Sequence, residues 1–102
     1  MELKTAWHGP SDVSPIGHAA NIHLGLSSHN LGVQEWAELM DSPILKEAFP
    51  GMPTIENGYL YISDKPGLGI DINEELIKKY PAKDDVVEWT QTRYPDGTMC
   101  TP

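Results

Sequence analysis

The chain has 102 residues, which is enough for one small domain at most and limits the apolar surface that it can bury. Its net charge of −8 argues against nucleic acid or an anionic membrane as a partner. A single cysteine excludes an internal disulfide, the first residues lack the basic and apolar regions of a signal peptide, and no apolar run approaches the ~18 residues of a membrane span. These features predict a cytoplasmic protein.

The first 35 residues predict a strand, a helix and a second strand. Residues 3–7 are a short apolar run, and Ser14 and Pro15 are residue types that open helices at the N-cap and the first turn. The helix should end near residues 27–30, and its apolar positions recur at spacings of three and four. These positions are Ile16, Ala19, Ala20, Ile22, His23 and Leu26. Residues 31–34 form the second strand, which should run parallel to the first because a helix connects the two.

Three polar side chains follow the carboxyl ends of these strands. His8 comes directly after the first strand, Asp12 lies in the turn beyond it, and Glu35 comes directly after the second strand. The carboxyl ends of parallel strands share one edge, where barrel enzymes place their active sites. Because neighbouring strands lie about 4.8 Å apart, His8 and Glu35 should reach one small ligand. A histidine with two carboxylates suits the hydroxyls and carboxylate of a polar substrate.

Each of these residues also has a simpler structural interpretation. His8 precedes a Gly-Pro turn and could bond only to nearby backbone, and Asp12 could cap the loop before the helix. A structural role is harder to assign to Glu35, since a carboxylate directly after a buried strand needs a partner or a ligand. The residues alone leave both interpretations open.

Two short helical segments are predicted after the second strand. Residues 36–40 begin one, which the Asp-Ser-Pro sequence at 41–43 interrupts. Residues 44–49 form the other, which ends at the Pro-Gly-Met-Pro loop of residues 50–53.

A turn, a strand and a loop follow. Residues 56–58 predict the turn because Asn and Gly tolerate positive φ, and residues 59–62 predict the strand. Gly67 and Gly69 indicate a tight loop. A nucleotide-binding motif would need a third glycine and a position between a strand and a helix.

The last predicted elements are a short helix and a hairpin. Asn73 should cap the helix, which has two glutamates in its first turn and two lysines, Lys78 and Lys79, in its last turn before Pro81. Residues 86–101 alternate as a hairpin around a turn at 94–97, with Gly97 in the left-handed position.

Four segments of the sequence resemble one enzyme family. They are HGPSDVSPIGHAANIHL from residue 8, VQEW from residue 33, NGYLYISDKPGLGIDINEE from residue 57 and EWTQTRYPDGTMCTP from residue 88. Together they are similar to the mannonate dehydratase branch of the enolase superfamily, and most of all to its starvation-sensing members.

The resemblance implies an α/β fold that is the carboxyl-terminal part of an enolase-type (β/α)8 barrel. Residues 1–55 would be the end of the barrel, with strands seven and eight and their connecting helix. Residues 56–102 would be a tail that packs on the barrel and returns to the capping domain. Because a complete barrel takes about 250 residues, the resemblance also implies that the chain is a fragment of a longer enzyme.

For function, the resemblance implies a Mg²⁺-dependent dehydratase that acts on a sugar acid such as D-mannonate or D-gluconate. Such enzymes remove the proton α to the carboxylate, stabilise the resulting anion with Mg²⁺ and expel the 3-hydroxyl to give a 2-keto-3-deoxy acid. The resemblance implies that His8, Asp12 and Glu35 bind the substrate. The metal ligands, the base and the acid of the family precede strand seven, so we expect the chain alone to bind no Mg²⁺ and to be inactive. Efficient mannonate dehydratases commonly carry HGA where residues 8–10 are HGP, which implies a weak mannonate dehydratase or another substrate acid such as gluconate.

Two other functions remain as alternatives. One is a non-catalytic, self-associating binding or regulatory module derived from such an enzyme. Two strands cannot close a barrel, and their open edges predict a homo-oligomer or docking onto a missing amino-terminal portion. The other is a small zinc hydrolase. It is disfavoured because His18 and His23 are five residues apart, which directs them away from each other on a helix and predicts that they pack or snorkel on its surface.

Overall fold

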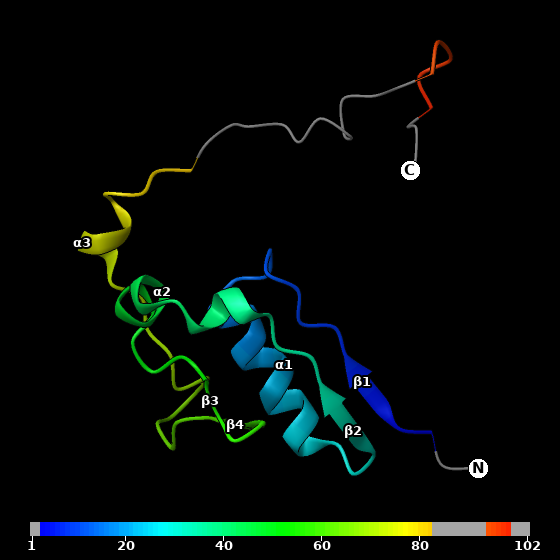
Figure 1. Ribbon diagram of the computed structural model, residues 1–102, viewed down its shortest axis with the longest axis vertical. Helices are drawn as coiled ribbons and strands as arrows, with labels where there is room; N and C mark the ends of the chain where they lie inside the picture. The colour runs from blue at the N-terminus through cyan, green and yellow to red at the C-terminus, as the bar shows by residue number, and fades with distance from the viewer. Residues whose placement is uncertain (1–2, 83–93, 99–102) are drawn as a thin grey trace.

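The amino-terminal part of the fold is a parallel pair of strands joined by a helix (Figure 1). A computed structural model describes residues 3–82 and 94–98. In it β1 (Thr5–Trp7) and β2 (Leu31–Gln34) pair in parallel, with Trp7 opposite Gln34 at the carboxyl ends, and α1 (Pro15–Ser27) connects them. The predicted strand–helix–strand unit is confirmed, including the bounds of the second strand.

Helix α1 begins at the predicted cap. The Gly17 amide donates to Ser14 Oγ at 3.2 Å, and Pro15 occupies the first helical position, where its missing N–H costs nothing. At the other end the Ser28 amide donates to the Gly25 carbonyl at 3.0 Å, and the chain leaves the helix.

Replacing Ser14 by Ala is expected to lower the free energy of unfolding by about 1 kcal/mol, because the Gly17 amide loses its acceptor. Urea denaturation of the two proteins measures this change. Ser11→Ala is the matched control, since Ser11 is an exposed serine of the same turn, and its effect should stay within about 0.5 kcal/mol. Equal losses in the two variants would contradict a capping role for Ser14.

The buried side of α1 differs from the predicted apolar positions. It consists of Pro15, His18, Ala19, Ile22 and Gly25. Ala20 is exposed and faces away from the sheet, and Leu26 in the last turn is 63% exposed. His18 was predicted to pack or snorkel on the helix surface, and its side chain is completely buried, so it packs and does not snorkel. The 3.6-residue period of the helix places residue 18 between residues 15 and 22 on its buried side.

Two short helices follow β2 and are close to the prediction. The first, η1 (Glu38–Asp41), is a 3₁₀-helix that begins two residues later than predicted, and the second, α2 (Pro43–Ala48), begins at Pro43. Proline suits the first turn of a helix because its φ is already helical, so Pro43 opens α2 rather than only ending the segment before it.

A small hairpin lies on the opposite side of α1 from the parallel pair (Figure 1). Strand β3 (Thr54–Glu56) pairs antiparallel with β4 (Tyr59–Tyr61), and Asn57 and Gly58 connect them with φ of 50° and 79°. The predicted turn and the strand after it are therefore confirmed, whereas β3 was not predicted.

The segment after the hairpin packs back on α2. Gly67 and Gly69 have φ of 69° and 70°, which confirms the tight loop. The Asp71 amide then donates to the Pro50 carbonyl at 2.9 Å, and the Asn73 amide donates to the Ala48 carbonyl at 2.8 Å. These two bonds hold the loop against the end of α2.

Helix α3 (Glu74–Ile77) is shorter than predicted. Asn73 Oδ1 accepts from the Leu76 amide at 3.2 Å, which confirms the cap. The prediction that Lys78 and Lys79 lie in the last turn is wrong, because Lys78 is the C-cap and the Lys79 amide bonds three residues back, to the Leu76 carbonyl. Pro81 keeps the helix from continuing further, since a proline disfavours helical backbone in the residue before it, here Tyr80.

Near the carboxyl end, the structure describes only the predicted turn. The Gly97 amide donates to the Tyr94 carbonyl at 2.9 Å, and Gly97 has φ of 87°, as expected. The Thr98 amide donates to Asp96 Oδ1 at 2.9 Å and lowers the pKa of that carboxyl. The strands of the predicted hairpin at residues 86–101 lie outside the described residues. Within the described part of the chain, no helix has the length and apolar character needed to cross a membrane.

Candidate functional site

His8 and Glu35 lie next to each other at the carboxyl ends of β1 and β2. The Glu35 amide donates to the Trp7 carbonyl at 3.0 Å, so the pairing of the strands extends by one residue. This brings His8 Nε2 to 3.5 Å from Glu35 Oε2. The predicted proximity of the two side chains is confirmed, whereas their role in binding a substrate stays a prediction.

Gly9 makes a further contact with Glu35. Its amide donates to Glu35 Oε2 at 2.9 Å, so one carboxylate oxygen lies near both His8 and Gly9. Gly9 is buried, and a Cβ on it would lie 2.0 Å from the Glu35 carbonyl oxygen. The turn can therefore lie against the backbone of Glu35 only with glycine at this position. Gly9 was not predicted as a site residue. A glycine directly after the candidate histidine was the feature of the sequence that could have identified it.

Gln34 binds the backbone on either side of the polar pair, at Trp7 and at Glu35. Its side-chain amide donates to the Glu35 carbonyl at 2.8 Å and lies 3.5 Å from the Trp7 carbonyl. These contacts join the last residue of β1 to the first residue after β2. Gln34 was also missed as a site residue, although its place beside Glu35 was a usable signal.

The pair of His8 and Glu35 is open to solvent. The His8 side chain is 79% exposed and the Glu35 side chain is 55% exposed. Exposed ion pairs contribute about 0–1 kcal/mol to folding, so the fold does not depend on this arrangement. An accessible imidazole beside a carboxylate that an amide holds in place can bind hydroxyl groups, which both donate and accept hydrogen bonds.

Asp12 stands apart from the other two candidates. It is exposed in the turn between β1 and α1, where the Val13 amide donates to the Pro10 carbonyl at 3.3 Å. No hydrogen bond or ion pair within residues 3–82 joins Asp12 to His8 or to Glu35. The structure thus does not bring Asp12 into contact with the pair.

The described residues do not fit a metal site by themselves. Mg²⁺ is held by converging oxygen ligands, chiefly carboxylates. Across residues 3–82 and 94–98, no group of three or more His, Cys, Asp or Glu side chains could hold a metal ion. His18 and His23 contact different carbonyls, those of Pro10 at 3.0 Å and Leu68 at 3.3 Å.

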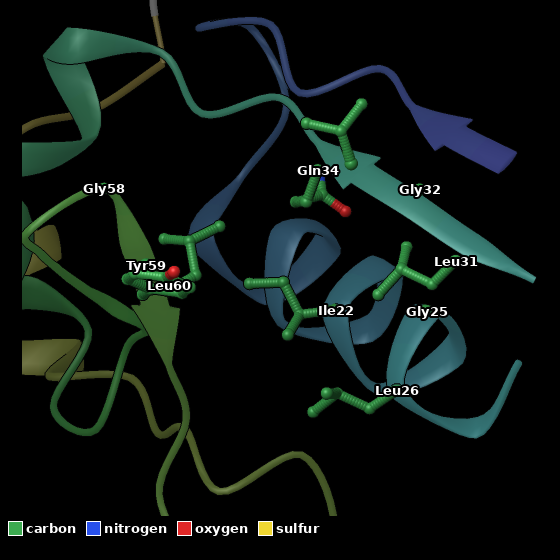
Figure 2. A pocket seen from close by; sticks show the side chains of 10 residues that line it. Ile22, Gly25, Leu26, Leu31, Gly32, Gln34, Gly58, Tyr59 and Leu60 are labelled. Carbon is green, nitrogen blue, oxygen red and sulfur yellow. The ribbon is translucent and has the colours of Figure 1, made fainter. Parts of the chain in front are cut away.

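A separate apolar groove lies between α1, β2 and the β3–β4 hairpin (Figure 2). Its volume is about 290 Å³. The residues that line it are Ile22, Gly25, Leu26, Leu31, Gly32, Val33, Gln34, Gly58, Tyr59 and Leu60. None of the three candidate residues is among them, so the groove is distinct from the polar pair.

The sequence matches a family model and curated relatives. The model described as Enolase C-terminal domain-like matches residues 1–76. A D-galactonate dehydratase family member of Musicola paradisiaca (strain Ech703) is 54% identical over 98% of this chain and 24% of its own length. The D-galactonate dehydratase family member RspA of Pantoea ananatis (strain LMG 20103) is 53% identical with the same coverage. The chain thus spans about a quarter of the length of these relatives.

A solved structure is similar over nearly the whole chain. It is the crystal structure of an enolase from Pantoea ananatis with bound D-gluconate and Mg. The TM-score is 0.82 and the sequence identity is 52%, over 98% of this chain and 24% of that one.

Proposed function

The chain belongs to the enolase C-terminal domain-like family, and from this we propose that it forms one part of a Mg²⁺-dependent sugar-acid dehydratase and contributes to its substrate site. The predicted fold class, the carboxyl-terminal part of an enolase-type barrel, is confirmed. The proposed substrate is an aldonic acid of the gluconate or mannonate type. Support for gluconate comes from the similar enzyme of Pantoea ananatis, whose structure holds D-gluconate.

The observation that carries the proposal is the exposed pair of His8 and Glu35 with the Gly9 amide. The amide fixes Glu35 Oε2 at 2.9 Å, and the carboxylate accepts a hydrogen bond from a substrate hydroxyl. His8, 3.5 Å from the same oxygen, donates to a second hydroxyl or to the substrate carboxylate. Asp12, which is exposed in the turn between β1 and α1, is proposed to bind a further hydroxyl.

This chain supplies orientation rather than the bond-breaking groups. A substrate held at several points presents its reacting carbon in one geometry, which lowers the barrier of the reaction. The chain spans about a quarter of the length of its relatives, and the metal ligands, the base and the acid are proposed to belong to the rest of the enzyme. The division of the chain into residues 1–55 and 56–102 remains part of the proposal, and its boundary falls within β3.

The first test is to recover the protein from its source cells with an antibody against residues 57–75, and to measure its mass and its activity. We expect a polypeptide of about 400 residues, or a complex of that size, as a barrel with a capping domain requires. With Mg²⁺ it should convert D-gluconate or D-mannonate to a 2-keto-3-deoxy acid. A protein of 102 residues without a partner and without activity would overturn the proposal.

In the recovered enzyme, Glu35→Gln is expected to lower kcat/KM for the sugar acid by about tenfold or more, because a charge-assisted hydrogen bond to the substrate becomes a neutral one. Steady-state kinetics measures the change. Glu47→Gln is the matched control, since Glu47 is an exposed glutamate of α2 and its loss should leave kcat/KM unchanged. Equal activity of the two variants would remove Glu35 from the substrate site.

A second candidate function is the non-catalytic, self-associating module. It is favoured by exposed apolar side chains around the groove, where Leu26 is 63% exposed, Val33 61% and Tyr59 70%. Sedimentation of the recovered protein separates the two candidates, because this module would form homo-oligomers of the short chain and would lack dehydratase activity.

A further inference from the structure

We propose that His18 is a positioning residue that sets the geometry of the His8–Glu35 pair. Its importance for catalysis rests on the proposed function, whereas its effect on the pair can be measured without a substrate. The proposal is based on three features of His18, which are its burial, its bond to the turn that carries His8, and its contact with the residue after Glu35.

His18 is buried in a way that its chemistry does not favour. Its side chain has no exposed surface, although histidine is seldom fully buried. Nδ1 has no hydrogen-bond partner among the described residues, and a buried polar atom without a partner lowers stability. An apolar side chain of similar size would fill the same space without this cost. A role in stability therefore does not explain a histidine here.

The first contact of His18 is with the turn after β1. Nε2 lies 3.0 Å from the Pro10 carbonyl oxygen. A carbonyl oxygen only accepts hydrogen bonds, so Nε2 carries the proton and donates it. Pro10 follows His8 and Gly9 directly, and the bond therefore holds this turn against α1, a helix of 13 residues.

The second contact is with the segment after β2. The rings of His18 and Trp36 have centroids 5.2 Å apart and planes inclined at 57°, an arrangement typical of packed aromatic rings. Trp36 directly follows Glu35. One side chain on a rigid helix thus contacts both segments that carry the pair, one by a hydrogen bond and one by packing.

The test uses the Gly9 amide as a reporter, because this amide donates to Glu35 Oε2 only when the two turns are in place. In the isotope-labelled protein, His18→Leu is expected to shift the Gly9 amide resonance and to reduce its protection from hydrogen exchange by about tenfold, as for the loss of one buried hydrogen bond. The midpoint of thermal unfolding should change little, since the variant removes the unpaired Nδ1 together with the donor to the Pro10 carbonyl.

Two further variants separate positioning from a general effect on the helix. His18→Gln keeps an N–H donor for the Pro10 carbonyl and should restore the Gly9 signal. His23→Leu is the matched control, because His23 also lies on α1 and bonds a carbonyl, that of Leu68 at 3.3 Å, away from the pair. It should leave the Gly9 signal as in the unmodified protein.

A folded His18→Leu variant with an unchanged Gly9 amide would overturn the proposal. If that variant does not fold, the imidazole nitrogen resonances of the unmodified protein decide. A proton on Nε2 of His18 supports the bond to Pro10, and a proton on Nδ1 alone excludes it. No sugar acid is present in these measurements, so their outcome is independent of whether the proposed function holds.

Discussion

Replacing Gly9 by Ala is expected to separate His8 from Glu35 and to destroy the candidate site. The new Cβ would lie 2.0 Å from the carbonyl oxygen and 2.7 Å from the carbonyl carbon of Glu35, and these are backbone atoms that cannot rotate away. The turn must therefore move by about an ångström, and the Gly9 amide loses Glu35 Oε2. A misplacement of this size costs about a hundredfold in rate, and overpacking of this kind lowers the free energy of unfolding by about 1–3 kcal/mol.

Gly17→Ala is the matched control for this prediction. A Cβ on Gly17 would approach Val13 Cγ1 at 2.8 Å, which is a side-chain atom that can shift, and alanine favours the helix by about 1 kcal/mol over glycine. The measurements are kcat/KM in the complete enzyme and urea denaturation of the chain. A Gly9→Ala variant as active and as stable as Gly17→Ala would show that the close approach to Glu35 is not needed.

Gly51→Ala is expected to reduce the free energy of unfolding by about 3 kcal/mol. Two effects combine. Gly51 has φ of 86°, which an alanine rarely adopts, and a Cβ at this position would lie 2.3 Å from the Gly69 carbonyl oxygen. The left-handed backbone alone costs an alanine about 1–2 kcal/mol. The clash forces the loop after α2 away from the segment at residues 69–73, where the bond from the Asp71 amide to the Pro50 carbonyl then breaks.

Gly58→Ala separates these two effects. Gly58 has nearly the same φ, 79°, but apart from its chain neighbours no atom of the described residues lies within 4 Å of the position of its Cβ. The Gly58→Ala substitution should therefore lower the free energy of unfolding by only the ~1–2 kcal/mol that the left-handed backbone costs an alanine. Urea denaturation of both variants measures the difference, which reports the contact between the two loops. Equal costs for Gly51→Ala and Gly58→Ala would mean that the loops are not packed together.

Elements with a self-contained local signal could be predicted from the sequence. Ser14 with Pro15, Asn57 with Gly58, and Asn73 each specify a cap or a turn through their own backbone preferences, and the structure has all three. Strand β3 (Thr54–Glu56) could not be predicted. It has only three residues, all exposed and preceded by a proline, which is too short to show an alternating pattern, and it is a strand because β4 pairs with it.

The parts of the site that follow from the order of the strands could be predicted from the sequence. The parts that follow from close contacts between residues far apart in the sequence could not. Parallel strands that end at the same level place His8 beside Glu35, and the family resemblance, confirmed by the match to the enolase C-terminal domain, supports the same residues. Gly9 and His18 were missed, because their importance lies in contacts of 2–3 Å with residues 8 or 26 positions away. The substrate acid and the cytoplasmic location stay predictions.

The arrangement of β1, α1 and β2 also has a consequence for how the protein folds. The contacts that place Glu35 beside Gly9 span 26 residues of chain, and the helix between them shortens the distance that the ends must search. Contacts that span 26 residues are non-local, and parallel pairing of this kind forms slowly because loop-closure entropy is lost before the native contacts form. The polar pair therefore depends on a non-local contact, whereas the β3–β4 hairpin is held by contacts between neighbouring parts of the chain.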